Sequence, residues 1–264
     1  MKIRILGAGA LGCAIGGVLT EGGNEVWLVN RNATQVAAMN RVGLTMREGG
    51  VDRVAPVHAA TNCNGVSLTS GPVDLVVVPV KSFHTRDAME SARAILGDNT
   101  VVLSLQNGIG QEDMLVDVVG RARVMAGKTY AGGVMLAAGR VIVGTIDKET
   151  IIGELDGNIS PRARRIADTF TRAGLHTTVS SDIMGSIWEK LLVNVATGAL
   201  SGITRLPFEF KASMLQSLEK GSVTEIDFVN GAVVAQGRKL GVPTPVNMAL
   251  VARMKGIEQS VLSA

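Results

Sequence analysis

The feature that most constrains the fold of this sequence is a glycine-rich turn close to its first residue. The turn, Gly7-Ala8-Gly9-Ala10-Leu11-Gly12, follows a strand-like run at 2–6 and opens an apolar helical stretch at 10–21. That helix is expected to stop at Gly22-Gly23, and residues 25–29 again have the pattern of a strand. The order of strand, turn, helix and strand predicts a βαβ unit.

The spacing of the glycines predicts what this turn binds. In a Gly-x-Gly-x-x-Gly turn, Gly7 permits the tight turn, Gly9 lets a pyrophosphate approach the backbone, and Gly12 lets the helix pack closely on the strand. Backbone N–H groups at the helix start then meet the phosphates. An ordinary turn without a ligand is the alternative, but the strand before it and the helix after it are the context that the motif requires. We therefore predict that Gly7, Ala8, Gly9, Ala10, Leu11 and Gly12 hold a dinucleotide.

The end of the second predicted strand bears on which dinucleotide is bound. NAD enzymes carry an acidic residue there for the ribose hydroxyls, whereas this sequence has Asn30-Arg31. A guanidinium at this position suits the 2′-phosphate of NADP, so NADP(H) is the predicted cofactor. The alternative is that Arg31 is only a solvated surface side chain.

The rest of the pattern predicts an α/β fold, with an N-terminal Rossmann-type doubly wound sheet and an all-helical C-terminal domain. Because 264 residues is long for a single core, we expect an NADP-binding domain at 1–180 and a helical substrate and dimerisation domain at 181–264. The further segments expected are helix 33–40, a hairpin of 44–47 with 53–57, strand 74–80, helix 85–96, strand 101–105, helix 111–119, strand 123–126, antiparallel additions near 134, 140–143 and 150–153, helix 161–173, strand 175–179, and helices 182–200, 212–220, 222–240 and 245–260.

Polar residues at two kinds of position suggest a reactive site. Lys81 and Asn107 come just past the ends of predicted strands, the edge that faces the ligand in open parallel sheets. Lys190 and Asn194 are four apart on one helix face among apolar neighbours, where a partly desolvated ammonium is a competent proton donor. Each has a plainer alternative: Lys81 as a solvated turn lysine, Asn107 as part of an Asn-Gly turn dipeptide, and Lys190 as a lysine whose ammonium reaches water.

A further group of polar residues lies in the predicted helix after residue 222. Glu225 and Asp227 stand beside aromatic and branched residues within 224–231, so some of these polar residues must face a polar cleft. The alternative for either acid is an exposed helix residue.

Composition and spacing exclude several other functions. The net charge is only +3 and the basic residues are scattered, so no nucleic-acid partner is expected. Neither the two cysteines, Cys13 and Cys63, nor the three histidines have partners at a ligand spacing, and no metal site is expected. No segment is long and apolar enough to cross a membrane, and no signal peptide is evident, so we expect a cytoplasmic protein.

Several motifs together resemble one known family, the ketopantoate reductases (2-dehydropantoate 2-reductases). Their order and most of their spacings match over nearly the whole chain, and a series of motifs is more specific than any one of them. The matching segments are residues 7–12, Val80-Lys81, residues 106–110, residues 188–194, residues 213–216 and residues 224–227.

The resemblance implies hydride transfer from NADPH to the C2 ketone of 2-dehydropantoate, giving (R)-pantoate for pantothenate and coenzyme A synthesis. It implies that Lys190 is the proton donor and that Glu225 helps to hold the cofactor and the substrate. The other roles that it implies are substrate contacts by Asn194 and Ser213 and cofactor contacts by Lys81, Asn107 and Gly133.

The chain departs from the family pattern in two places. Gly198 stands where a second substrate-contacting asparagine is expected. Only five residues separate Pro207 from Ser213, where family members carry several tens more. Either the helical domain is shortened or a segment is absent, and a true deletion would open the cleft and leave an oligomer, such as a homodimer, to complete it. The alternatives left open are a reductase of another branched 2-oxo acid and an inactive NADP-binding protein.

Overall fold

The computed structural model describes residues 1–64, 72–144, 146, 148–208 and 211–263. The chain divides into two compact units, the first comprising Met1–Gln106 and Gln111–Ser186 and the second Asn107–Gly110 and Ile187–Ala264. The division falls within helix α7 (Ile183–Thr204), whereas the sequence placed it near residue 181. The functions assigned to the two parts stay predictions.

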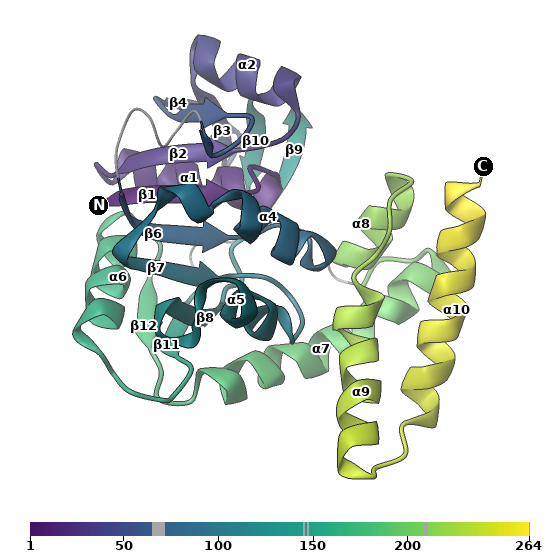
Figure 1. Ribbon diagram of the computed structural model, residues 1–264. Coiled ribbons are helices and arrows are strands. Elements are labelled where there is room, and N and C mark those ends of the chain that lie inside the picture. The colour runs from purple at the N-terminus through teal and green to yellow at the C-terminus, as the bar shows by residue number, and fades with distance from the viewer. Residues whose placement is uncertain (65–71, 145, 147, 209–210, 264) are drawn as a thin grey trace. The chain divides into compact units, whose positions relative to one another are not determined.

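The first unit is built on an eight-stranded sheet with the order β12-β11-β8-β7-β6-β1-β2-β5 (Figure 1). The strands from β8 to β5 in this order pair in parallel, and β11 joins β8 in the antiparallel direction, which confirms the predicted doubly wound sheet with an antiparallel addition. The strands are β1 (Lys2–Leu6), β2 (Glu25–Val29), β5 (His58–Ala60), β6 (Val73–Val78), β7 (Leu96–Ser104), β8 (Val124–Lys128), β11 (Thr150–Glu154) and β12 (Thr177–Val179).

A second, four-stranded sheet in the same unit has the order β4-β3-β10-β9. Its strands are β3 (Leu44–Glu48), β4 (Val51–Ala55), β9 (Gly133–Ala137) and β10 (Arg140–Val143). The hairpin of β3 and β4 is confirmed, and β10 pairs antiparallel with β9 as expected. The parallel pairing of β10 with β3, which joins the hairpin to a segment far along the chain, was not predicted.

Helix α1 (Ala10–Glu21) lies between these two sheets, and its bounds are those predicted. Two adjacent glycines show how closely it packs: a Cβ on Gly16 would lie 2.4 Å from Cδ2 of Leu28, and one on Gly17 would lie 2.2 Å from Sδ of Met46. The first contact is with β2 and the second with β3. Helix α1 is therefore apolar on both sides because it is buried on both.

Further helices of the first unit cover the two faces of the eight-stranded sheet (Figure 1). Residues of α6 (Pro161–Arg172) share one apolar core with α1, and residues of α4 (Thr85–Ser91) and α5 (Gln111–Val119) share a second core on the opposite face. The predicted helix 85–96 is only partly confirmed, because α4 ends at Ser91. The remaining elements of this unit are α2 (Ala33–Val42) and the 3-10 turns η1 (Ser82–His84), η2 (Arg93–Ile95) and η3 (Arg121–Arg123).

The described residues of the second unit form helices joined by loops, with no strand among them. It comprises α7, α8 (Ser213–Glu219), the 3-10 turn η4 (Ile226–Phe228), α9 (Asn230–Leu240) and α10 (Pro245–Leu262). The helix predicted over 222–240 is wrong before residue 230, where α9 begins. There the backbone N and the Oγ1 of Thr224 donate to Oε1 of Glu258, at 2.7 and 2.5 Å, so a contact with α10 replaces helical hydrogen bonding.

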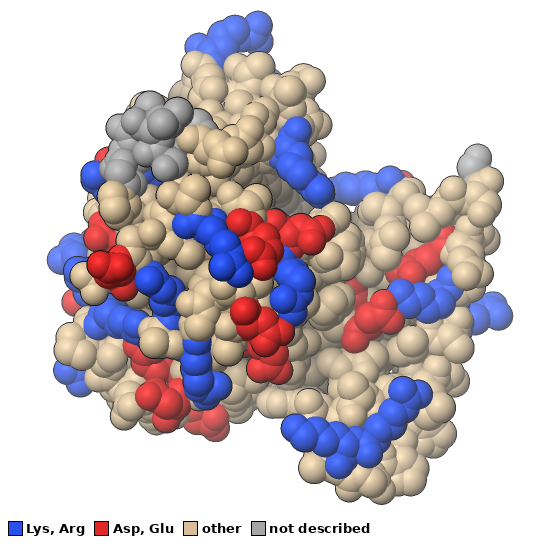
Figure 2. All heavy atoms as spheres, in the orientation of Figure 1, with Lys and Arg blue, Asp and Glu red and all other residues tan. Residues whose placement is uncertain are grey.

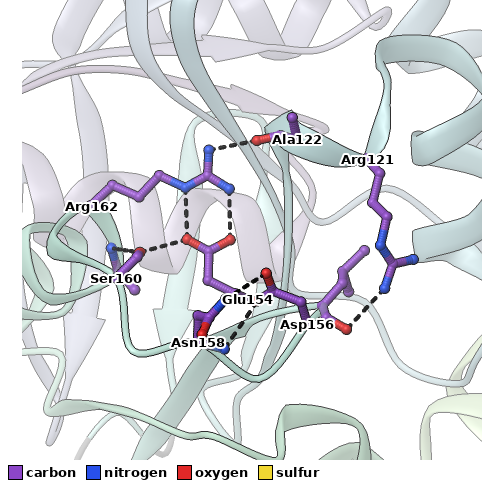
Figure 3. A network of polar contacts seen from close by, with 9 residues as sticks. Arg121, Ala122, Glu154, Asp156, Asn158, Ser160 and Arg162 are labelled. Atoms are coloured by element: carbon purple, nitrogen blue, oxygen red, sulfur yellow. Dashed lines mark hydrogen bonds and ion pairs between the residues drawn. The ribbon is translucent and has the colours of Figure 1, made fainter.

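An ion pair between a buried carboxylate and a partly exposed arginine stabilises the first sheet near one edge (Figure 3). The Glu154 carboxylate, at the end of β11, accepts hydrogen bonds from Nε and Nη2 of Arg162 at 2.7 and 2.6 Å and from Oγ of Ser160 at 2.6 Å. Ser160 caps α6 by accepting from the Ala163 N–H, and Arg162 also donates to the Ala122 carbonyl. The pair therefore ties β11, α6 and the segment before β8 together.

Replacing Arg162 with alanine is expected to lower the free energy of unfolding by about 1–2 kcal/mol at pH 7, because it leaves a buried carboxylate without its partner. Burial raises the pKa of Glu154, but hydrogen bonds from Arg162 and Ser160 more than offset this, so its pKa is lowered overall. This stabilisation is present above the unfolded-state pKa of about 4.3 and is lost as the pH falls through the lower folded-state pKa.

Urea denaturation at pH 7 and near pH 3 checks this prediction. The difference between the natural chain and the R162A variant should shrink in acid. The exposed Arg164 on the same helix provides the control, since R164A should change stability by less than about 0.5 kcal/mol at either pH. Equal effects of the two substitutions at pH 7 would contradict the assignment.

Candidate functional site

The glycine turn in the first unit has no room for side chains at two of its positions. Gly7 has a φ of +108°, and a Cβ there would lie 2.7 Å from Cγ1 of Val80. A Cβ on Gly12 would lie 2.1 Å from the carbonyl oxygen of Gly7. The turn can close only with glycine at both places, as expected for a helix that begins tightly against its strand.

The third glycine faces open space. Gly9 is the N-cap of α1 and is exposed, and a Cβ built on it meets no atom within 4 Å among the described residues. The first turn of α1 carries no acidic side chain and has no side-chain cap, so the positive end of the helix dipole faces this space. The arrangement fits the pyrophosphate of a dinucleotide.

Other predicted cofactor residues lie close to this turn. Nδ2 of Asn30 donates to the carbonyl of Ala8 at 2.7 Å, which joins the end of β2 to the turn and places Arg31 beside it. The approach of Val80 to Gly7 brings Lys81, the next residue, to the same edge of the sheet. A Cβ on Gly133 would lie 3.1 Å from the carbonyl oxygen of Ala10. The first unit therefore gathers the turn, Arg31, Lys81 and Gly133.

One neighbour in this group was not predicted. Nη2 of Arg31 lies 3.1 Å from Nε2 of His84, a residue of η1. The sequence gives His84 no partner at a metal-ligand spacing, and no sequence pattern joins it to Arg31, which lies 53 positions away.

The predicted proton donor lies in the second unit, in contact with another predicted site residue. Nζ of Lys190 donates to Oδ1 of Asn107 at 2.7 Å. Asn107 belongs to the short segment that follows β7 and that packs with the helices: a Cβ on Gly108 would lie 2.4 Å from the carbonyl oxygen of Phe228, and the Ile109 N–H donates to that oxygen at 3.1 Å. The loop therefore holds Asn107 beside the lysine.

The other site residues of this unit differ in exposure. Glu225 is buried, with 6% of its surface exposed, directly before η4, whereas Asp227 is exposed and pairs with Lys255. Asn194 lies one turn beyond Lys190 on α7 and is half-buried, and Ser213 begins α8 and is exposed. Of the two acids, Glu225 is therefore the one withdrawn from water.

Gly198, where the resemblance predicts an asparagine, is covered by a side chain of α8. The residue is buried, and a Cβ built on it would lie 3.3 Å from Cε and 3.4 Å from Sδ of Met214 in α8. An asparagine here would have to displace a methionine that is itself only 2% exposed. Met214 thus occupies the space that a side chain at position 198 would need. Of the short connection from Pro207 to Ser213, residues 209–210 lie outside the described residues.

The described residues show no other centre of chemistry that competes with these. They contain no group of His, Cys, Asp and Glu that could hold a metal, and no helix among them is long and apolar enough to cross a membrane. Burial raises the pKa of Cys13 to about 12 and that of Cys63 to about 11, so both thiols stay protonated at neutral pH. On the face shown in Figure 2, basic and acidic side chains of the first unit are interspersed.

Comparison with known proteins places the chain among related sequences. The family model described as "Ketopantoate reductase PanE/ApbA" matches residues 3–157, and the model of its C-terminal part matches residues 209–258. A 2-dehydropantoate 2-reductase of Pyrococcus horikoshii is 32% identical over 305 aligned positions that cover 98% of each chain. Those positions exceed the 264 residues of this chain by 41, so this chain is the shorter of the two.

Solved structures agree with the sequence comparison. A PanE/ApbA family ketopantoate reductase from Ralstonia eutropha JMP134 has a TM-score of 0.89 and 28% identity, with 99% of both chains covered. A D-mandelate dehydrogenase, solved with NADH and anilino(oxo)acetate, has a TM-score of 0.92 and 25% identity, also with 99% of both chains covered. The fold, the glycine turn and the match of the family model to more than half of the sequence lead to one conclusion: the chain belongs to the ketopantoate reductase family of oxidoreductases.

Proposed function

We propose that this protein reduces 2-dehydropantoate to (R)-pantoate with NADPH, a step of pantothenate and coenzyme A synthesis. The observation that carries the proposal is the 2.7 Å contact between the Lys190 ammonium and Asn107, in a chain of this family. Reduction of a ketone needs a hydride at the carbonyl carbon and a proton at the carbonyl oxygen. An ammonium held by an amide oxygen is suited to the second task.

The cofactor is proposed to bind through Gly7, Ala8, Gly9, Ala10, Leu11 and Gly12, with Arg31, Lys81, Asn107, Gly133 and Glu225 as further contacts. When bound, NADPH supplies the hydride. The open space beside Gly9 and the N-terminus of α1 would receive the pyrophosphate, and the exposed guanidinium of Arg31 would pair with the 2′-phosphate. The choice of NADP over NAD rests on Arg31 and on the lack of an acid at the end of β2.

The residues of the second unit are proposed to act on the substrate. Lys190 gives its proton to the oxygen that becomes the hydroxyl of the product, and its charge stabilises the developing alkoxide. Asn107 holds the ammonium in place, and the buried Glu225 helps to hold the cofactor and the substrate. Asn194 and Ser213 contact the substrate as hydrogen-bonding partners.

A second candidate function is the reduction of another branched or aromatic 2-oxo acid. The observation that favours it is that the Met214 side chain packs against Gly198, because an apolar side chain then stands where a hydrogen bond to the substrate was expected. The similar D-mandelate dehydrogenase was solved with NADH, so a different cofactor preference is also part of this alternative.

A comparison of kcat/KM values separates the two functions. NADPH and NADH oxidation by the purified chain would be followed with 2-dehydropantoate, 2-oxoisovalerate and an aromatic 2-oxo acid. We expect 2-dehydropantoate with NADPH to give the highest value. A preference of more than about a hundredfold for another acid, which corresponds to roughly 2.7 kcal/mol, would reject the first function in favour of the second.

We also propose that the enzyme works in the cytoplasm, with a small-molecule 2-oxo acid as its only substrate partner, and that it forms a homodimer. These proposals rest on the family and on the short helical part of the chain. Sedimentation equilibrium of the purified protein gives the mass of the assembly and so tests the dimer.

A further inference from the structure

His84 is held in a defined position beside Arg31. Its loop is pinned to the sheet by Gln106, whose Nε2 donates to the Val80 carbonyl at 2.8 Å and to Oγ1 of Thr85 at 2.7 Å. The Phe83 ring packs edge-on against the imidazole, with 4.7 Å between the ring centroids. The Arg31–His84 contact is thus formed by two segments of one unit, each tied to the sheet.

The contact also determines the protonation state of the histidine. A guanidinium can only donate hydrogen bonds, so Nε2 of His84 must accept, and the imidazole is neutral with its proton on Nδ1. Protonation would place a hydrogen on Nε2 and turn an attractive contact into one between two cations. Without a ligand, Arg31 therefore opposes the charged form of His84.

The charged groups that act on the imidazole are few. Burial lowers the pKa of His84, the positive charge of Arg31 from the end of β2 lowers it further, and Asp87 on α4 raises it in part. The shift is downward overall from 6.5, so His84 is neutral at pH 7 in the free protein.

A phosphate dianion would reverse this balance. The end of β2 is where dinucleotide-binding folds place the adenosine ribose, and there a 2′-phosphate carries close to two negative charges above its pKa of about 6. With a dianion to pair with, the guanidinium no longer has to be satisfied by Nε2, and a positive imidazolium becomes a second favourable partner.

We propose that His84 and Arg31 together recognise the 2′-phosphate of NADP(H), and that His84 takes up a proton as that phosphate binds. This inference rests on the proposed use of NADPH. Proton uptake by His84 should make the affinity for NADPH increase as the pH falls from 8 toward 6.5, because the protein with NADPH bound carries more protons than the free protein. The affinity for NADH, which has no 2′-phosphate, should not change.

Calorimetric titration of the full chain with NADPH and with NADH tests the proposal. Titrations at pH 6.5 in two buffers with different ionisation enthalpies give the number of protons taken up on binding, and titrations from pH 6.5 to 8 give the affinity. For the natural chain we expect net proton uptake with NADPH and a gain in affinity of about fivefold over this range. With NADH we expect neither.

The H84Q variant is the decisive one, because a glutamine oxygen still accepts from Arg31 but does not titrate. It should bind NADPH at pH 8 as the natural chain does, and it should lose the proton uptake and the gain in affinity at pH 6.5. H176Q, a change at an exposed histidine elsewhere on the same unit, should keep both.

The outcomes that would overturn the inference differ in what they say about the cofactor. Undiminished proton uptake in H84Q, or equal uptake with NADH, rejects the role of His84 and leaves NADPH as the cofactor. If, in addition to either of these results, the R31A variant no longer preferred NADPH over NADH, Arg31 alone would recognise the phosphate. Binding of NADH in preference to NADPH by the natural chain rejects the proposed cofactor itself, and the inference with it.

Discussion

Replacing Lys190 with alanine is expected to lower kcat for ketone reduction by about 10²- to 10⁴-fold, the usual contribution of a general acid. The substitution removes the ammonium that Asn107 holds at 2.7 Å, and with it both the proton and the charge that stabilises the alkoxide. NADPH binding should be largely retained, since the glycine turn and Arg31 are untouched. Steady-state kinetics and a fluorescence titration with NADPH measure the two effects separately.

Two further variants make this test specific. The K190R substitution would keep the positive charge, but a guanidinium does not give up its proton, so kcat should stay low. The exposed Lys220 of the same unit serves as the matched control, and K220A should leave kcat unchanged. If K190A kept kcat within about threefold of the natural chain, Lys190 would not be the acid.

The second large effect is expected from alanine at two glycines of the same turn, with opposite consequences. In G12A the new methyl group would lie 2.1 Å from a backbone oxygen that cannot move without opening the turn, so we expect a loss of about 3 kcal/mol or more in the free energy of unfolding. In G9A the methyl group meets nothing and the φ of −80° suits alanine, so the fold should be unaffected.

The methyl group of G9A would instead occupy the space proposed for the pyrophosphate. NADPH affinity should fall about ten- to a hundredfold, the value of one lost hydrogen bond to a charged group. Urea denaturation and NADPH titration of both variants check the pair. A G9A variant that binds NADPH normally would show that the turn does not hold the cofactor, and a stable G12A variant would show that the close packing of α1 is not needed.

Local signals allowed much of the fold to be predicted from the sequence. The bounds of α1, β1 and β2 are those expected, because a glycine turn and a glycine pair mark their limits. Strand β5 was missed because three residues are too few for a pattern. The start of α9 was misplaced because Thr224 bonds to Glu258, a tertiary contact that no local propensity reveals.

The candidate site was predictable as residue types but not as contacts. Lys190 and Asn107 were each singled out, yet they are 83 residues apart, and only the packing of the loop after β7 on η4 brings them together. Nothing in the sequence indicated that His84 lies at the cofactor site, and only its contact with Arg31 in the structure shows that it lies beside a predicted cofactor residue. Gly198 was interpreted as a missing hydrogen bond, and the structure adds that Met214 fills the place.

Turnover by this 264-residue chain is the property on which the proposed function depends most. The most direct measurement is the oxidation of NADPH by the purified protein in the presence of 2-dehydropantoate, with pantoate quantified in the same samples. We predict that NADPH is consumed and pantoate is formed in equal amounts. Tight binding of NADPH without its oxidation, by this acid or any other 2-oxo acid, would contradict the proposed function and identify the chain as an inactive NADP-binding protein.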